Sequence, residues 1–175
     1  MNFSLDKSIE LLERTPLVYE SLFRDSHSAF DTVNEGAQTW NAHNIIGHLI
    51  YGEMTDWIPR AQLILDQNIQ DKTFSPYDRF AQDRLFHSQS TNQLLDEYKS
   101  RRFENIQTLK SWKLTDEQLL WTGIHPDLGI VTLKELISTW TIHDLVHINQ
   151  ISRVLVKHYQ SDIGPWIKYV GFLNN

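Results

Sequence analysis

The chain has 175 residues, of which 41% are hydrophobic and 22% charged, and a net charge of -6 at pH 7. This is the composition of a globular protein, and we expect residues 1–175 to form one domain. The 0 cysteines exclude disulfides, thiolate nucleophiles, iron–sulfur clusters and cysteine-ligated zinc. Lys and Arg are scattered, which argues against a nucleic-acid partner. There is no run of about 18 apolar residues and no signal-peptide pattern, so we expect a cytoplasmic protein without a membrane partner.

Helical spacing of apolar residues begins near the N-terminus and predicts a mostly α-helical chain. A first helix is predicted over about residues 5–23, with a kink or a restart at Thr15-Pro16, which has the pattern of an N-cap followed by proline. A second helix is predicted from Asn41, a favourable N-cap, to about residue 65, with a bend at Pro59. Residues 66–89 are polar and are predicted to form a connection long enough to cover a pocket.

The middle of the chain is expected to contain a third helix and a tight turn. The helix is predicted over about residues 90–112, with one apolar stripe facing the core. Thr115 and Gln118 have the spacing of a capping box, which predicts a short helical turn. Residues 125–129 predict a turn in which Gly129 has a positive φ, so a turn or hairpin is expected before the last long helix.

The last long helix is the most strongly patterned element of the sequence. It is predicted to start at a second capping box, Thr132 with Glu135, and nothing interrupts it before Gly164-Pro165. A short helix around residues 166–172 is expected to follow. Four long helices joined by mostly modest connections predict an all-α fold, an antiparallel four-helix bundle around one core.

The 8 histidines are the unusual feature of the composition, and two of them lie four positions apart in the last helix. His143 and His147 are about 40° apart around a helix axis and about 6 Å apart along it, so their rings can bind one ion. They fall on the apolar arc of the helix, which carries Leu133, Leu136, Ile137, Trp140, Ile151, Val154 and Leu155. Two core histidines hydrogen-bonded to carbonyls or carboxylates are the alternative interpretation.

His48 in the second helix is the candidate third ligand. It lies between apolar positions, and Gly52 one turn later leaves room beside its ring. Three imidazoles on one side of a metal leave other coordination positions for water or substrate, which is the layout of a catalytic site. Asp144 on the same arc could hold the second N–H of a ligand or form an internal salt bridge.

Two other interpretations of these residues rank lower. The segment from His143 to His147 is similar to the zincin pattern H-E-x-x-H, but it has the shorter Asp144 in place of the Glu general base and lacks the residues that extend that motif. Several tryptophans could line a substrate site, but core packing is the expected role of Trp40, Trp57, Trp140 and Trp166.

Several segments of the chain resemble those of one known family and occur in the same order. They are residues 40–49, 56–60, 125–133 and 139–151, together with Arg102. They are similar to the DinB superfamily of metal-binding four-helix-bundle proteins, also described as YfiT-like. The resemblance implies an up-down-down-up bundle and often a homodimer, and it places the metal ligands at His48, His143 and His147. The expected cofactor is a divalent metal ion, with zinc or nickel first and iron or manganese as alternatives.

The resemblance also suggests a function, because characterised relatives include bacillithiol transferases and a mycothiol-dependent isomerase, while other members are called hydrolases by analogy. We therefore expect a metal-dependent hydrolase or thiol S-transferase that acts on a small molecule and activates water or a low-molecular-weight thiol at the three-histidine site. Residues that could support the ligands or line the pocket are Asp144, Gln150, His125 and Arg102. Structural roles are the competing interpretation, a turn residue for His125 and an ion pair for Arg102.

A non-catalytic metal-binding or stress-response module is the alternative function, and an interaction protein with merely buried histidines is a third interpretation. A fourth protein ligand, such as Glu53 or Asp56, would favour a structural metal. An open coordination position beside a roomy pocket would favour the enzyme.

Overall fold

A computed structural model of the chain describes residues 3–173, apart from the side chain of Phe172. The domain expected over residues 1–175 therefore includes four terminal residues that lie outside the described part.

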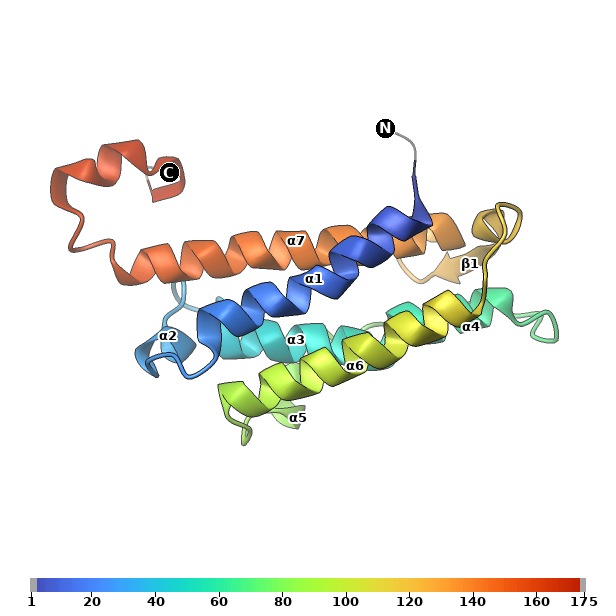
Figure 1. The fold of residues 1–175 in the computed structure, drawn as a ribbon, viewed down its shortest axis with the longest axis horizontal. Helices are drawn as coiled ribbons and strands as arrows, with labels where there is room; N and C mark the ends of the chain where they lie inside the picture. The colour runs from blue at the N-terminus through green and yellow to red at the C-terminus, as the bar shows by residue number, and fades with distance from the viewer. Residues whose placement is uncertain (1–2, 174–175) are drawn as a thin grey trace.

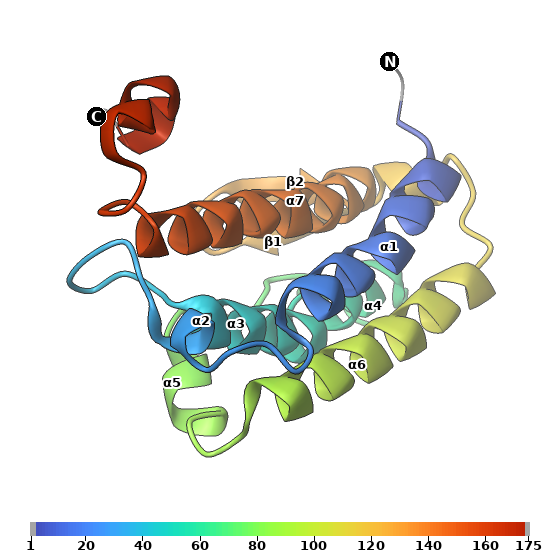
Figure 2. The same cartoon turned by 60° about the vertical axis from the view of Figure 1, so that its left-hand side comes forward.

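The four-helix bundle is built from α1 (Leu5–Phe23), α3 (Ala42–Thr55) continued by α4 (Trp57–Leu65), α6 (Thr91–Ser111) and α7 (Leu133–His158). Figures 1 and 2 show that α3, α4 and α6 run in one direction and α1 and α7 in the other, which is the predicted up-down-down-up order. Helix α6 packs against α1 and α3, and α7 packs against α1, α3 and α4. The shorter elements are α2 (Ala29–Thr32), α5 (Ala81–Leu85), β1 (Thr122–His125), β2 (Gly129–Thr132) and three 3-10 helices, Gln118–Leu120, Gly164–Tyr169 and Gly171–Leu173.

Helix α1 continues through Pro16 without the restart that the sequence suggested. Proline has no N–H, so the carbonyl of Leu12, four residues earlier, loses its helical hydrogen bond. That carbonyl accepts a hydrogen bond from Nη1 of Arg102 on α6 at 2.9 Å instead. The proline therefore leaves an acceptor on α1 that connects this helix to the interior of the bundle.

The break between α3 and α4 lies at Asp56, where φ is -107° and ψ is -70°, and not at Pro59 as predicted. The ring of Pro59 would collide with the carbonyl of Thr55, four residues before it, in a continuous helix. The helix therefore ends at Thr55 and restarts after Asp56. Pro59 then lies in the first turn of α4, where a missing N–H leaves no bond unmade.

The connection predicted over residues 66–89 is anchored to the hairpin. The N–H of Phe74 donates to the carbonyl of Ile124 at 2.9 Å, and the N–H of Ile124 donates to the carbonyl of Lys72 at 2.9 Å. These bonds place a third extended segment beside β1, which pairs antiparallel with β2. The connection also contains α5, and it places Tyr77 against α3, where its hydroxyl donates to the carbonyl of His48.

The hairpin and the capping boxes appear where the sequence predicts them. Gly129 has φ +75° at the turn. Thr132 and Glu135 cap α7 reciprocally, and Thr115 and Gln118 make the same exchange before the 3-10 helix Gln118–Leu120. Helix α7 ends at His158, well before Gly164, and 3-10 helices replace the short helix expected over residues 166–172.

The tryptophans divide between the core and the surface. Trp57 and Trp140 are buried and their rings stack 6.1 Å apart, as core packing predicts. Trp166 contradicts that prediction, because 69% of it is exposed and the 3-10 helix that carries it, Gly164–Tyr169, buries none of its residues. Trp40 is half-buried at the start of α3.

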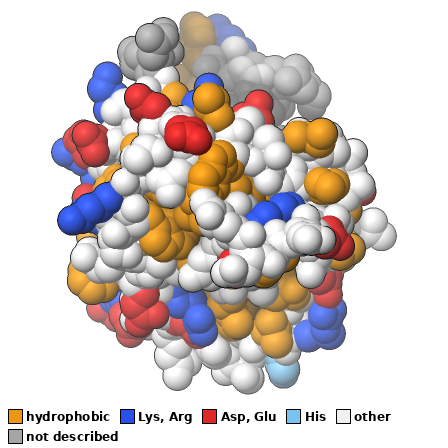
Figure 3. Space-filling model, turned by 90° about the vertical axis from the view of Figure 1, so that its right-hand side faces the viewer, with side chains coloured by type: hydrophobic (Ala, Val, Ile, Leu, Met, Phe, Trp, Pro, Cys, Tyr) orange, Lys and Arg blue, Asp and Glu red, His pale blue; other side chains and the backbone are white. Residues whose placement is uncertain are grey.

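Figure 3 shows the end of the molecule that lies on the right in Figure 1, where acidic and basic side chains alternate with hydrophobic ones. This face therefore carries no broad field of one charge sign. Among the described residues, none of the helices has the length and apolar character needed to cross a membrane.

Packing at Gly123 gives a test of how tightly the connection is held. A Cβ atom at this position of β1 would lie 2.5 Å from the ring of Phe74, so we expect Gly123→Ala to lower the free energy of unfolding by about 1–3 kcal/mol. Gly171→Ala is the control, because a Cβ there meets nothing within 4 Å, and it should change stability by less than about 0.5 kcal/mol. Urea unfolding measures both, and equal stabilities of the two variants would contradict the packing.

Candidate metal centre

Three histidine side chains from two helices meet inside the bundle. Nε2 of His143 lies 3.1 Å from Nε2 of His48 and 3.2 Å from Nε2 of His147. All three histidines offer a ring nitrogen within 4.8 Å of the others. The structure thus brings together the pair predicted on α7 and the third histidine predicted on α3.

The spacing of these nitrogens fits one metal ion. Two imidazole nitrogens that bind the same ion at about 2.0–2.1 Å are about 2.8–3.4 Å apart, depending on the coordination geometry. The separations of Nε2 of His143 from Nε2 of His48 and of His147, 3.1 Å and 3.2 Å, lie within this range. Imidazole nitrogen is also a preferred donor for zinc, nickel and iron, so both the geometry and the donor set are suitable.

Hydrogen bonds on the far side of two rings orient their Nε2 atoms toward the common point. Nδ1 of His147 lies 2.8 Å from Oε1 of Gln150, which can only accept, so the proton of this ring is on Nδ1. The hydroxyl of Tyr77 lies 3.1 Å from Nδ1 of His48 and 3.3 Å from its backbone carbonyl. Because the carbonyl takes the hydroxyl proton, Nδ1 of His48 is the donor to Tyr77. Both rings therefore present a bare Nε2 lone pair.

Burial keeps the three imidazoles neutral. Burial, and then the neighbouring imidazoles, lower the pKa of His48 to about 2, and burial with the adjacent His147 lowers the pKa of His143 to about 3. The pKa of His147 is also lowered, mainly by burial. Neutral rings retain the lone pairs that a metal needs, so the site is ready to bind a cation near neutral pH.

His143 is held by packing, because its Nδ1 is buried without a hydrogen-bond partner among residues 3–173. The edge of its ring meets Trp57, with ring centroids 5.1 Å apart. Asp144, the neighbour that could have held this N–H, is fully buried and forms an ion pair with Arg102 instead, with Oδ2 2.6 Å from Nη1. This arrangement also excludes Asp144 as the general base of a zincin-like motif.

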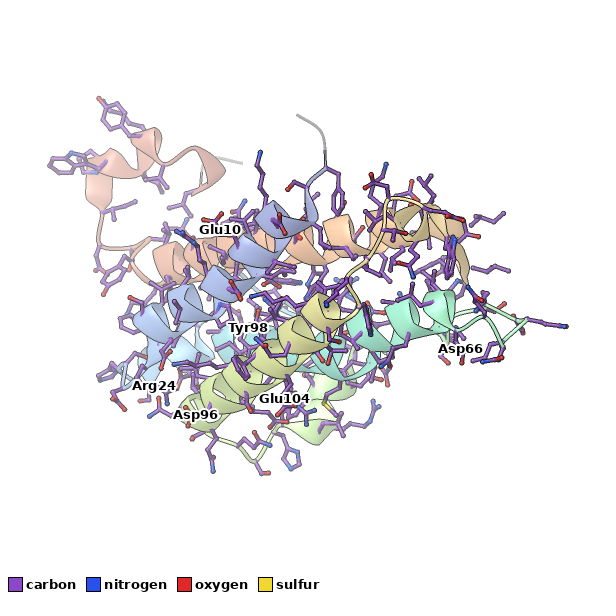
Figure 4. All side chains as sticks on the ribbon, turned by 45° about the vertical axis from the view of Figure 1, so that its right-hand side comes forward. Glu10, Arg24, Asp66, Asp96, Tyr98 and Glu104 are labelled. Carbon is purple, nitrogen blue, oxygen red and sulfur yellow. The ribbon has the colours of Figure 1, made fainter. Side chains whose placement is uncertain are left out.

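Arg102 binds two carboxylates in the interior of the bundle. Its guanidinium contacts Glu53 on α3 at 2.7 Å and Asp144 on α7 at 2.6 Å, and all three side chains are at most 3% exposed. We call these three side chains and the residues that hydrogen-bond to them the Arg102 network; the partners are Leu12, Thr15, Tyr98, Asn105 and Trp140. Figure 4 shows labelled Tyr98 of this network on α6. The structure therefore assigns Arg102 the ion-pair role that the sequence left open.

Neither carboxylate proposed as a fourth ligand joins the histidines. Glu53 accepts hydrogen bonds from Arg102, from Nε1 of Trp140 at 2.9 Å and from Nδ2 of Asn105 at 2.9 Å. Asp56 forms an ion pair with Nε of Arg60 at 2.5 Å. Among the described residues, the group that could hold a metal contains His48, His143 and His147 only.

The open side of the three histidines faces a cavity of about 430 Å³. Its wall includes the aromatic side chains of Trp40, Trp57 and Tyr77 and, near the hairpin, His125. The Nδ1 atom of His125 accepts from the backbone N–H groups of Asp127 and Leu128, so His125 both caps the turn and lines the cavity. Arg102 and Asp144 do not line it.

Sequence reasoning missed Tyr77 and Arg79, which lie on the connection and line the cavity. The connection has no helical or strand periodicity, so nothing in the sequence indicates where its side chains point. The only available signal is the length of the segment, which predicted that it could cover a pocket.

Comparison with known proteins supports the fold. A model of the DinB superfamily matches residues 11–151, a range that contains all three histidines. Among solved structures, the chain is similar to YfiT from Bacillus subtilis, described as a probable metal-dependent hydrolase with an unusual four-helix bundle topology. The two share 20% identity over 90% of each chain, with a TM-score of 0.75. A search of functionally curated proteins found no match.

The hydrogen bond from His48 to Tyr77 gives a test of how the rings are oriented. Removing the hydroxyl in Tyr77→Phe should weaken metal affinity by about 10- to 100-fold, the usual effect of losing the partner of a ligating histidine. Tyr159→Phe is the control, because Tyr159 is 50% exposed and does not line the cavity. Competition with a chromophoric chelator measures both affinities, and an unchanged affinity in Tyr77→Phe would refute the role of Tyr77.

Proposed function

The chain belongs to the DinB superfamily, and from this premise we propose that it is a metal-dependent enzyme, a hydrolase or thiol S-transferase acting on a small molecule. His48, His143 and His147 would hold a divalent ion, with zinc or nickel as the first candidates and iron or manganese as alternatives. The cosubstrate in this scheme is water or a low-molecular-weight thiol. A homodimer remains a prediction from the family resemblance.

One observation carries the proposal: three clustered nitrogen donors face a cavity, and no carboxylate among residues 3–173 joins their group. A structural metal is usually enclosed by four protein ligands, whereas a catalytic one keeps a position for water or substrate. When bound, a divalent ion would lower the pKa of a water or thiol there and so supply a nucleophile near neutral pH.

Each residue near the three histidines has a different role in this proposal. Tyr77 and Gln150 accept the Nδ1 protons of His48 and His147 and so keep the Nε2 atoms available. Trp40 and Trp57 form apolar walls that exclude bulk water from one side of the centre. His125 stands at the cavity wall near the turn, where an imidazole can exchange a proton with a bound substrate.

The non-catalytic module is less well supported. It would be favoured if Glu53 or Asp56 closed the coordination sphere, but both carboxylates are engaged by arginines. A purely structural metal site also does not require a cavity beside its ligands, whereas a substrate-binding site does. The enzyme is therefore the better account of the same residues.

Metal content tests the proposal. We expect about one ion per chain in the purified protein, and less than a tenth of that in His48→Ala and His143→Ala, because two imidazoles seldom retain an ion through purification. The matched control is His87→Ala, because His87 is an exposed histidine just after α5 whose ring contacts a backbone carbonyl. Elemental analysis of all four proteins gives the result.

Turnover is then measured on the same four proteins with ester, amide and thiol-plus-electrophile substrates. Activity that follows metal content supports the enzyme. Full metal content in His48→Ala or His143→Ala would refute the site, and a stoichiometric metal that raises Tm without any turnover would favour the non-catalytic module.

A further inference from the structure

Arg79 differs from every other arginine of the chain. Seven of the eight arginines form ion pairs with a carboxylate, including the two that are buried, Arg60 and Arg102. No Asp or Glu among residues 3–173 lies within ion-pair distance of Arg79. Its sequence neighbour Asp78 is already paired with Arg84 at 2.5 Å.

The guanidinium of Arg79 is nevertheless held in a defined place. It lies over the ring of Trp40, 5.4 Å from the ring centroid. The indole of Trp40 also contacts two of the proposed ligands, with ring centroids 4.7 Å away for His48 and 6.3 Å away for His147. Arg79 and these two imidazoles therefore contact the same indole, and Arg79 lines the same cavity as the three histidines.

The remaining charges of the cavity do not neutralise Arg79. Asp56 and Arg60 line the cavity as a closed pair. Asp127 also lines it but is exposed on the turn of the hairpin, without an ion pair among the described residues. With a divalent ion on the three neutral imidazoles, the part of the cavity between Arg79 and the ion would carry excess positive charge. An anion between them would relieve this charge.

We propose that Arg79 binds an anionic group of the substrate, a carboxylate or a phosphate, beside the three-histidine centre. This inference rests on the proposed function and names the class of its substrate, a small organic anion. A guanidinium donates two parallel hydrogen bonds to such a group. Among the described residues, that of Arg79 contacts the face of Trp40 and forms no ion pair that would occupy its N–H donors. Arg79 is thus a specificity residue, which selects the substrate and orients it toward the ion.

The test compares anion binding by the wild-type chain and by Arg79→Gln, with zinc added at one equivalent and without it. Butyrate and inorganic phosphate are the probes, and butyramide is the neutral analogue. NMR titration gives each Kd. Arg14→Gln is the matched control, because it removes the same charge from an exposed arginine on α1, paired with Glu10.

We expect at least one anion to bind the wild-type chain and Arg14→Gln, and to bind Arg79→Gln about 10- to 100-fold more weakly, the range for losing a charge-assisted hydrogen bond. Butyramide should bind none of them measurably. Whichever anion binds more tightly identifies the group as carboxylate or phosphate. Equal affinities of wild type and Arg79→Gln, or no anion binding by the wild-type chain, would overturn the inference.

Failure of the metal site is distinguishable in the same experiment. Zinc content and Tm are measured for each variant, and Arg79→Gln should retain both, because Arg79 is exposed and contacts none of the ligands by a hydrogen bond. The wild-type chain could bind no zinc while Arg79→Gln still binds anions more weakly than the wild-type chain does. That result would support the anion site and refute the metal-dependent function. If the wild-type chain binds zinc and Arg79→Gln binds anions as tightly as the wild-type chain does, the metal site is supported and the anion site is refuted.

Discussion

The buried guanidinium of Arg102 is the interaction on which the arrangement of the helices depends. A charge in a protein interior is tolerated only with full pairing, and here one cation faces two carboxylates, Glu53 and Asp144. Neutral donors from α1 and α6, the hydroxyls of Thr15 and Tyr98, share the excess negative charge at Asp144. Since breaking such a pair costs about 3–5 kcal/mol, the helices are fixed in one register relative to each other.

The Arg102 network also determines where the histidines lie. Glu53 is on α3 together with His48, and Asp144 stands next to His143 on α7. One guanidinium therefore fixes the two helix segments that carry the proposed ligands, without itself lining the cavity. The final orientation of the rings comes from local partners, since Tyr77 and Gln150 bind Nδ1 atoms and Trp57 packs against His143. Long-range ion pairing and short-range hydrogen bonding together bring the three imidazoles of the candidate metal site to one place.

Features that depend on local periodicity or capping could be predicted from the sequence, and those that depend on tertiary pairing could not. The i,i+4 spacing of His143 and His147 on an apolar arc is local to one helix, so their inward direction was predictable. The partners of Arg102 lie on other helices, and the sequence could not distinguish an ion pair from a pocket residue. The break at Asp56 differs from the prediction because a proline ring acts on the residue four positions before it. Tyr77 and Arg79 were missed because their segment is positioned by hydrogen bonds to the hairpin. It has no periodic pattern from which the direction of its side chains could be predicted.

The protonation of the histidine rings in the metal-free protein tests most directly whether the site is arranged in advance. Long-range ¹H–¹⁵N correlation NMR at pH 7 distinguishes Nδ1–H, Nε2–H and doubly protonated imidazole. We expect His48 and His147 to be neutral and to carry their proton on Nδ1 before any metal is added, with Nε2 bare. An Nε2–H tautomer or an imidazolium at either position would contradict it, because the lone pairs would then not point at a common site.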